Sequence, residues 1–145
     1  NDDLVMNPGL YCVGAFSISG GTVTGSGVTI YMNGTGSNDW FSVSGGTVSL
    51  EAPGDDSLSP AVKGLLVYMG HASSVNLGGN ADSYYAGTVY APRALIDVGG
   101  TSDINPTYST QLIGDTVTVH GTARIDINFD LSSIFQDPSY VDLYR

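Results

Sequence analysis

The sequence is poor in basic residues, and this shortage excludes whole classes of partner. Four lysine and arginine side chains stand against 14 acidic ones, which gives a formal net charge of −10. An acidic surface without basic clusters repels phosphate backbones and anionic lipid headgroups. Nucleic acid and anionic membrane surfaces are therefore excluded as expected partners.

Long apolar runs are also missing. No segment approaches the roughly 20 apolar residues of a membrane helix, and no basic stretch precedes an apolar one as in a leader peptide. We therefore expect no membrane segment in this chain. It starts at Asn1 without a methionine, which favours a mature or excised domain whose targeting segment is missing.

Cysteine occurs once, as Cys12. A single thiol excludes an intrachain disulfide and leaves the redox compartment open. Its apolar neighbours favour a buried, small hydrophobic side chain. The alternative is an exposed thiol that pairs with another subunit.

What the sequence does contain is serine, threonine, asparagine and 20 glycines, arranged in repeats. Segments 75–79, 96–100 and 117–121 share one pattern at a spacing of 21 residues, and 16–24 returns as 41–49 at a spacing of 25. Val67-Tyr68 returns as Val89-Tyr90. A nearly constant period of this length is typical of stacked coils. In register, Leu77, Val98 and Val119 should stack on one another, as should the turn glycines.

These repeats predict an all-β fold: a single right-handed parallel β-helix (solenoid) of about six coils with a C-terminal cap. One domain should span 1–145, with coils over about 8–130 and the cap and tail over 131–145. Val117 and Val119 should point inward. Excursions are expected at 51–60 and 102–108. The predicted strands are 11–18, 22–24, 28–32, 41–44, 47–51, 65–69, 74–77, 86–90, 94–98, 111–113, 116–120 and 123–129.

One polar column could hold a metal ion. Asn76, Asp97 and Thr118 should stack on the outer face, and their oxygens suit Ca²⁺. No calcium-loop motif supports that idea, so no cofactor is expected, with Ca²⁺ as the alternative. His71 and His120 lack the partners of a zinc site.

Glycan cleavage is the alternative function that the predicted fold itself suggests, because many β-helices cleave glycans. A hydrolase could use carboxylates from Asp97, Asp115 and Asp126. A lyase would need a base near a cation, and the four cations are Lys63, Arg93, Arg124 and Arg145. Solubilising surface acids explain the same residues, so we expect no enzyme.

Exposed aromatics are the better candidates for contact. Phe41 repeats Phe16 and should lie in the core. Trp40 and one of Tyr84 or Tyr85 must then face out, because alternate residues of a strand point to opposite sides. Such rings can seat a protein or a sugar. Trp40, Tyr84 and Tyr85 are the candidate contact residues.

Several motifs occur in the order of a known family: Gly9-Leu-Tyr-Cys-Val-Gly14, Gly25-Ser-Gly-Val-Thr-Ile-Tyr31, Gly87-Thr-Val-Tyr-Ala-Pro92 and Gln111-Leu-Ile-Gly-Asp-Thr-Val-Thr-Val-His-Gly121. Over about residues 8–129 the chain resembles the C-terminal β-helical region of TadG-like Flp-pilus assembly proteins and related bacterial envelope proteins. The resemblance implies an extracellular or cell-envelope location and a structural or adhesive role. It implies no catalytic residues.

The expected function is therefore a non-enzymatic envelope or pilus-associated module that offers a rigid surface to protein partners or to copies of itself. The alternative is a β-helix that binds or cleaves carbohydrate.

Overall fold

The chain folds into a β-solenoid, described by a computed structural model for residues 3–34, 39–80, 82–100, 107–121, 126–127 and 135. Ten strands form one sheet in which every pairing is parallel. The strands are β1 (Asp3–Met6), β2 (Gly9–Val13), β3 (Phe16–Gly25), β4 (Val28–Met32), β5 (Trp40–Glu51), β6 (Leu65–Met69), β7 (Ser74–Leu77), β8 (Tyr84–Gly100), β9 (Thr107–Gly121) and β10 (Asp126–Ile127).

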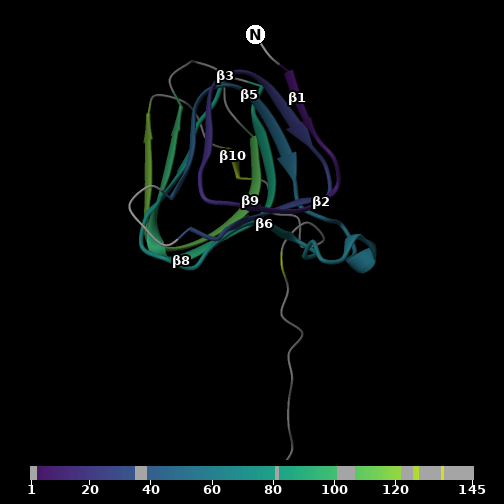
Figure 1. Cartoon of the computed structure of the whole chain (residues 1–145). Coiled ribbons are helices and arrows are strands. Elements are labelled where there is room, and N and C mark those ends of the chain that lie inside the picture. The colour runs from purple at the N-terminus through teal and green to yellow at the C-terminus, as the bar shows by residue number, and fades with distance from the viewer. Residues whose placement is uncertain are drawn as a thin grey trace, which may run out of the picture.

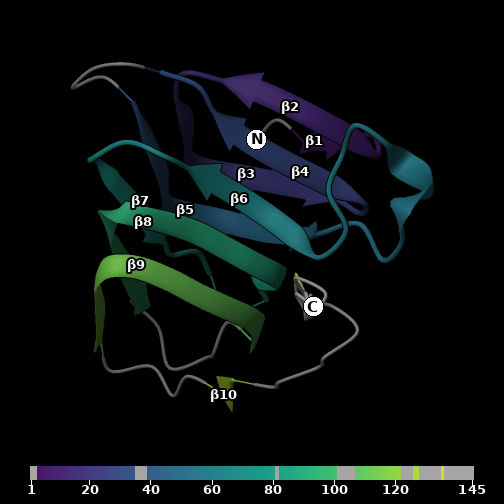
Figure 2. The ribbon, with the colours of Figure 1, turned by 90° about the horizontal axis from the view of Figure 1, so that it is seen from below.

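The strands lie on three faces, and the long ones turn corners between faces. Figure 1 looks roughly along the stack, and Figure 2 shows the strands one beside another from purple to green. The first face carries β1, parts of β3, β5, β8 and β9, and β10. The second face carries β2, β4, β6, β8 and β9 in that order. The third carries parts of β3, β5, β8 and β9 together with β7.

Five successive strands on the second face correspond to about four turns. The all-β solenoid predicted from the repeats is confirmed, whereas six coils are not. The predicted cap at 131–145 lies outside the described residues, apart from Phe135. The predicted strand 123–129 is described only at β10, and Thr107 of the predicted loop 102–108 already belongs to β9.

Registers predicted from the repeats are those observed. Phe16 pairs with Phe41, Val67 with Val89 and Leu77 with Val98. The turn glycines also stack, since Gly21 and Gly46 both have a positive φ, of 79° and 83°. A side chain at Gly46 would lie 2.7 Å from the carbonyl oxygen of Gly21. This corner therefore requires glycine in successive turns.

The interior is filled by columns of apolar side chains from the three faces. Each fully buried side chain of this size contributes about 1.5–3 kcal/mol relative to an exposed one. Fully buried members include Val28, Ile30, Phe41, Val43, Val48, Leu50, Val67, Val75, Leu77, Val89 and Ile96.

The last long strand is β9, and its inward-facing side chains extend the apolar columns to the end of the described structure. Val117 and Val119 pair with the buried Ile96 and Val98, so they share the interior face as predicted. They are nevertheless 43% and 60% exposed, because β9 is the last strand of this ladder among the described residues.

The excursion predicted at 51–60 is present and runs from β5 to β6. It contains a single turn of 3-10 helix, η1 (Asp56–Leu58), and no α-helix occurs in the described part of the chain. Figure 2 shows this teal segment beside the purple strands of the first turn. None of the helices in the described ranges is long and apolar enough to cross a membrane.

Candidate functional site

A row of three stacked tyrosines is the most prominent feature of the outer surface. The ring centroids of Tyr31 and Tyr68 are 5.1 Å apart with planes inclined by 6°. Those of Tyr68 and Tyr90 are 5.8 Å apart and inclined by 21°. We call Tyr31, Tyr68 and Tyr90 the tyrosine ladder; it lies on the second face, on β4, β6 and β8.

Strand alternation creates this ladder. In each of the three strands the residue before the tyrosine, Ile30, Val67 or Val89, is fully buried in the core. The next side chain must therefore point outward. In-register parallel pairing then places the three rings above one another.

The geometry of the ladder decides what it can bind. The rings stack face to face, so the middle ring offers its edge and hydroxyl to a partner rather than its face. Tyr31 and Tyr90 are 40% and 36% exposed. The column continues with Cys12 beside Tyr31 and with Ile113, 37% exposed, beside Tyr90. An apolar ridge tipped with hydroxyls matches the aromatic centres of protein interfaces.

Cys12 belongs to this outer column, so the prediction of a buried thiol is wrong. The thiol is exposed, because Tyr11 and Val13 on either side of it pack against the core. The apolar residues next to it in the sequence are the residues of this strand that face inward. The alternative of an exposed thiol is the correct one, and its pairing with another subunit stays a prediction.

The three candidate aromatics do not form one surface. Trp40 is 38% exposed on the third face, and Tyr84 is half-buried on the first face. Tyr85 is fully buried, and its hydroxyl donates to the carbonyl oxygen of Gly78 at 2.8 Å. The prediction that Trp40 and one member of the tyrosine pair face out is confirmed, and Tyr85 is corrected from a contact residue to a core residue.

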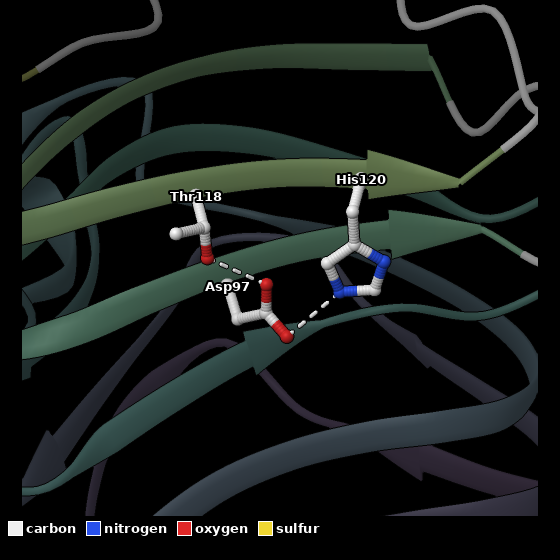
Figure 3. A network of polar contacts seen from close by, with 3 residues as sticks. All are labelled: Asp97, Thr118 and His120. Carbon is white, nitrogen blue, oxygen red and sulfur yellow. Dashed lines mark hydrogen bonds and ion pairs between the residues drawn. The ribbon is translucent and has the colours of Figure 1, made fainter.

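The polar column on the third face forms as predicted, with a different set of partners. Asn76, Asp97 and Thr118 lie in register. Thr118 Oγ1 donates to Asp97 Oδ1 at 2.7 Å, and His120 Nε2 lies 2.9 Å from Asp97 Oδ2 (Figure 3). The bond with His120, followed by that with Thr118, lowers the pKa of the Asp97 carboxyl.

Both oxygens of this carboxylate are thus engaged by side chains. Within the described ranges, no three histidine, cysteine or acidic side chains gather as metal ligands. The Ca²⁺ alternative at this column therefore gains no support from the geometry.

The second histidine meets an acid at another corner. His71 Nε2 lies 3.4 Å from Asp39 Oδ2, and both side chains are largely buried. Of the residues considered for catalysis, Asp115, Lys63 and Arg93 are exposed. The side chains of Asp126, Arg124 and Arg145 lie outside the described residues.

A cavity of about 440 Å³ lies where the excursion leaves the coil, with Tyr84 and Glu51 in its lining. Tyr84 is one of the contact residues predicted from the sequence, whereas Glu51 and the tyrosine ladder are not. The ladder did leave a signal, because Ile30-Tyr31, Val67-Tyr68 and Val89-Tyr90 are each an apolar residue followed by tyrosine near the end of a predicted strand.

Comparison with protein families gives one match, over residues 7–134, to a family described as a domain of unknown function, DUF7305. This match covers nearly the whole chain. The chain belongs to the DUF7305 family. No curated protein and no solved structure matches it. The DUF7305 description assigns no activity, so the resemblance to TadG-like proteins remains a prediction.

Proposed function

We propose that this protein is a non-enzymatic structural and adhesive module of the bacterial cell envelope, or of a pilus-associated assembly, that offers a rigid surface to other proteins. The observation that carries the proposal is the exposed tyrosine ladder. The location rests on the sequence resemblance to TadG-like proteins. The finer architecture, a right-handed helix of six coils capped by residues 131–145, is part of the same proposal.

Rigidity is what makes the ladder suitable for contact. Each tyrosine backbone is fixed by parallel pairing on both sides of its strand. Each ring is further restrained by the next ring. Little side-chain entropy is therefore lost on binding, and tyrosine is among the residues that contribute most to protein interfaces.

The polar column on the third face links neighbouring turns through its side chains, which suits a rigid scaffold. Asp97 is held by Thr118 and His120, which is the arrangement of a surface hydrogen-bond network. A second copy of this chain and a different envelope protein are both partners of the proposed kind.

Site-specific photo-crosslinking in the native cells tests this proposal. A photoreactive phenylalanine analogue replaces Tyr68 in one variant and Ser44, an exposed residue of β5, in the control. We expect crosslinks to a discrete envelope protein, or to a second copy of the chain, from position 68 and not from position 44. Equal crosslinking from both positions, or recovery of the protein outside the envelope fraction, would contradict the proposal.

A further inference from the structure

A groove runs along the corner between the first and second faces. The cavity of about 440 Å³ lies between the excursion and the coil, with Glu51 and Tyr84 on the coil side and Asp55 and Ser57 on the excursion side. A second cavity of about 250 Å³ shares Ser26 and Glu51 with it. The second cavity continues along the first face past Ser49 and Thr24 to Val5.

The wall of the groove is held in place at several points. Ala52 N donates to Ala86 O at 2.8 Å, and Gly64 N donates to Pro53 O at 2.8 Å. Val62 N donates to Thr29 Oγ1 at 3.0 Å. The excursion is thus fastened to the coil at both its ends.

Its middle is fastened as well, by packing over the first two turns. Gly27 has a φ of 73°, and a side chain there would lie 2.7 Å from Leu58 Cδ1 and 3.3 Å from Pro8 Cβ. Leu58 therefore sits close over Gly27, in space that only glycine leaves open. The groove is formed before any ligand arrives, which lowers the cost of binding.

The lining combines an aromatic ring with hydrogen-bond acceptors. Ser26 Oγ donates to Glu51 Oε2 at 2.9 Å and so orients that carboxylate. Ser57 N donates to Asp55 Oδ1 at 2.9 Å. Hydrogen bonds from Ser57 lower the pKa of Asp55, so its carboxylate is an ionised acceptor at neutral pH.

Tyr84 has room for a partner on one side of its ring. It pairs in register with Ser49, whose side chain is too short to cover an aromatic ring. In the tyrosine ladder, the middle ring is covered on both sides, and each of the two outer rings is covered on one side by a neighbouring tyrosine. Tyr84 also lines the cavity, which no residue of the tyrosine ladder does, so its ring is placed to stack against a flat ligand face within the groove.

We propose that this groove binds a neutral oligosaccharide, with the Tyr84 ring packed against a sugar face and with Glu51 and Asp55 accepting hydrogen bonds from sugar hydroxyls. A hydroxyl-rich ligand supplies the donors that carboxylates need. No lysine or arginine lines the described cavities, and the net charge of −10 disfavours anionic glycans.

The length of the groove selects a chain of sugars over a single one. It passes beside β1, β3, β5 and β8. Neighbouring strands are about 4.8 Å apart, so three steps span roughly 14 Å. This site is separate from the tyrosine ladder, and the proposal does not depend on the protein-contact function.

Titration of the isotopically labelled full chain tests the site by NMR. The probes are the hexasaccharides of β-1,4-glucose, α-1,4-glucose, β-1,4-mannose and β-1,4-N-acetylglucosamine, each raised to millimolar concentration. We expect at least one of them to shift the amide signals of residues 26, 51, 55, 57 and 84. A hexamer of galacturonate should shift none of them.

Matched variants distinguish the loss of a lining side chain from a general effect on folding. Tyr84→Ala and Glu51→Gln should each weaken binding by about tenfold or more, equivalent to about 1.4 kcal/mol. Tyr84→Phe keeps the ring and Asp115→Asn removes an acid elsewhere on β9, and both should retain the affinity within a few fold. The proposal fails if no neutral hexasaccharide shifts these signals, or if Tyr84→Ala and Glu51→Gln bind as tightly as the unaltered chain.

Discussion

The carboxylate of Asp97 lies between two side chains of the strand one turn later. Its strand partner Thr118 donates to one oxygen, and His120 engages the other. The two bonds explain why the pKa of Asp97 is lowered in the folded protein. A depressed carboxyl pKa makes folding stability depend on pH in a defined direction.

Replacing Asp97 by asparagine should therefore reduce stability in a pH-dependent way. The stabilisation from Asp97 is present above the pKa of the unfolded chain, about 3.9, and is lost as the pH falls through the lower folded value. Because the pair is partly exposed, the loss near neutral pH should be under about 1 kcal/mol. Urea unfolding at about pH 7 and about pH 3 measures it.

Asp115→Asn is the control for this measurement, since it removes one negative charge from an exposed site on β9. The stability difference between the two variants should shrink toward acidic pH. A difference that is the same at both pH values would show that the contacts of Asp97 do not depend on its charge.

At the scale of elements, β4, β6 and β8 share more than backbone hydrogen bonds. Their tyrosines stack in two pairs, Tyr31 with Tyr68 and Tyr68 with Tyr90. Cross-strand aromatic pairs of this kind contribute about 0.5–1.5 kcal/mol each beyond the area they bury. The middle strand takes part in both pairs, and each outer strand takes part in one.

Tyr68→Ala should consequently destabilise the protein more than Tyr31→Ala does, by about 0.5–1.5 kcal/mol. Chemical denaturation of the two variants and of Tyr90→Ala gives the comparison directly. Equal losses at positions 31 and 68 would mean that the stacking contributes little beyond burial.

The whole chain carries a large excess of negative charge. With a net charge of −10, self-repulsion opposes the folded state at low ionic strength. Salt reduces this repulsion, since the Debye length falls to about 10 Å at 0.1 M.

Sodium chloride raised from about 0.01 to about 0.1 M should therefore increase the melting temperature. Calcium and magnesium chloride at matched ionic strength should raise it equally if screening is the only effect. A rise in melting temperature that is specific to Ca²⁺ and reversed by a chelator would instead indicate a calcium site. It would support the Ca²⁺ alternative considered for the polar column.

How far the sequence predicts this solenoid depends on how constant the number of residues in each turn is. Asn76, Asp97 and Thr118 follow a constant spacing, so their register was predictable and is confirmed. The excursion lies between Tyr31 and Tyr68 in the sequence, so no constant period reveals that they pair. Strand alternation explains why the Cys12 side chain points outward. The predicted strand 11–18 did not reveal this, because it crosses the corner between β2 and β3, where the alternation is interrupted.

The candidate groove was harder to foresee for a different reason. Glu51 and Tyr84 come together because β5 pairs with β8, a pairing that the repeats do not indicate. The opposite wall depends on Leu58 packing over Gly27, a contact that lies outside the repeating part of the chain. Periodicity predicts the coil and says little about a segment that leaves it.

The excursion between β5 and β6 has a consequence for how such proteins change over evolutionary time. Residues inserted at a corner leave every column of the coil in register, because β6 still pairs with β4 as the strands before the insertion do. An insertion within a strand would instead reverse the inward and outward side chains beyond it. Corners are therefore the places where a lineage can add, exchange or delete a loop while the coil stays unchanged.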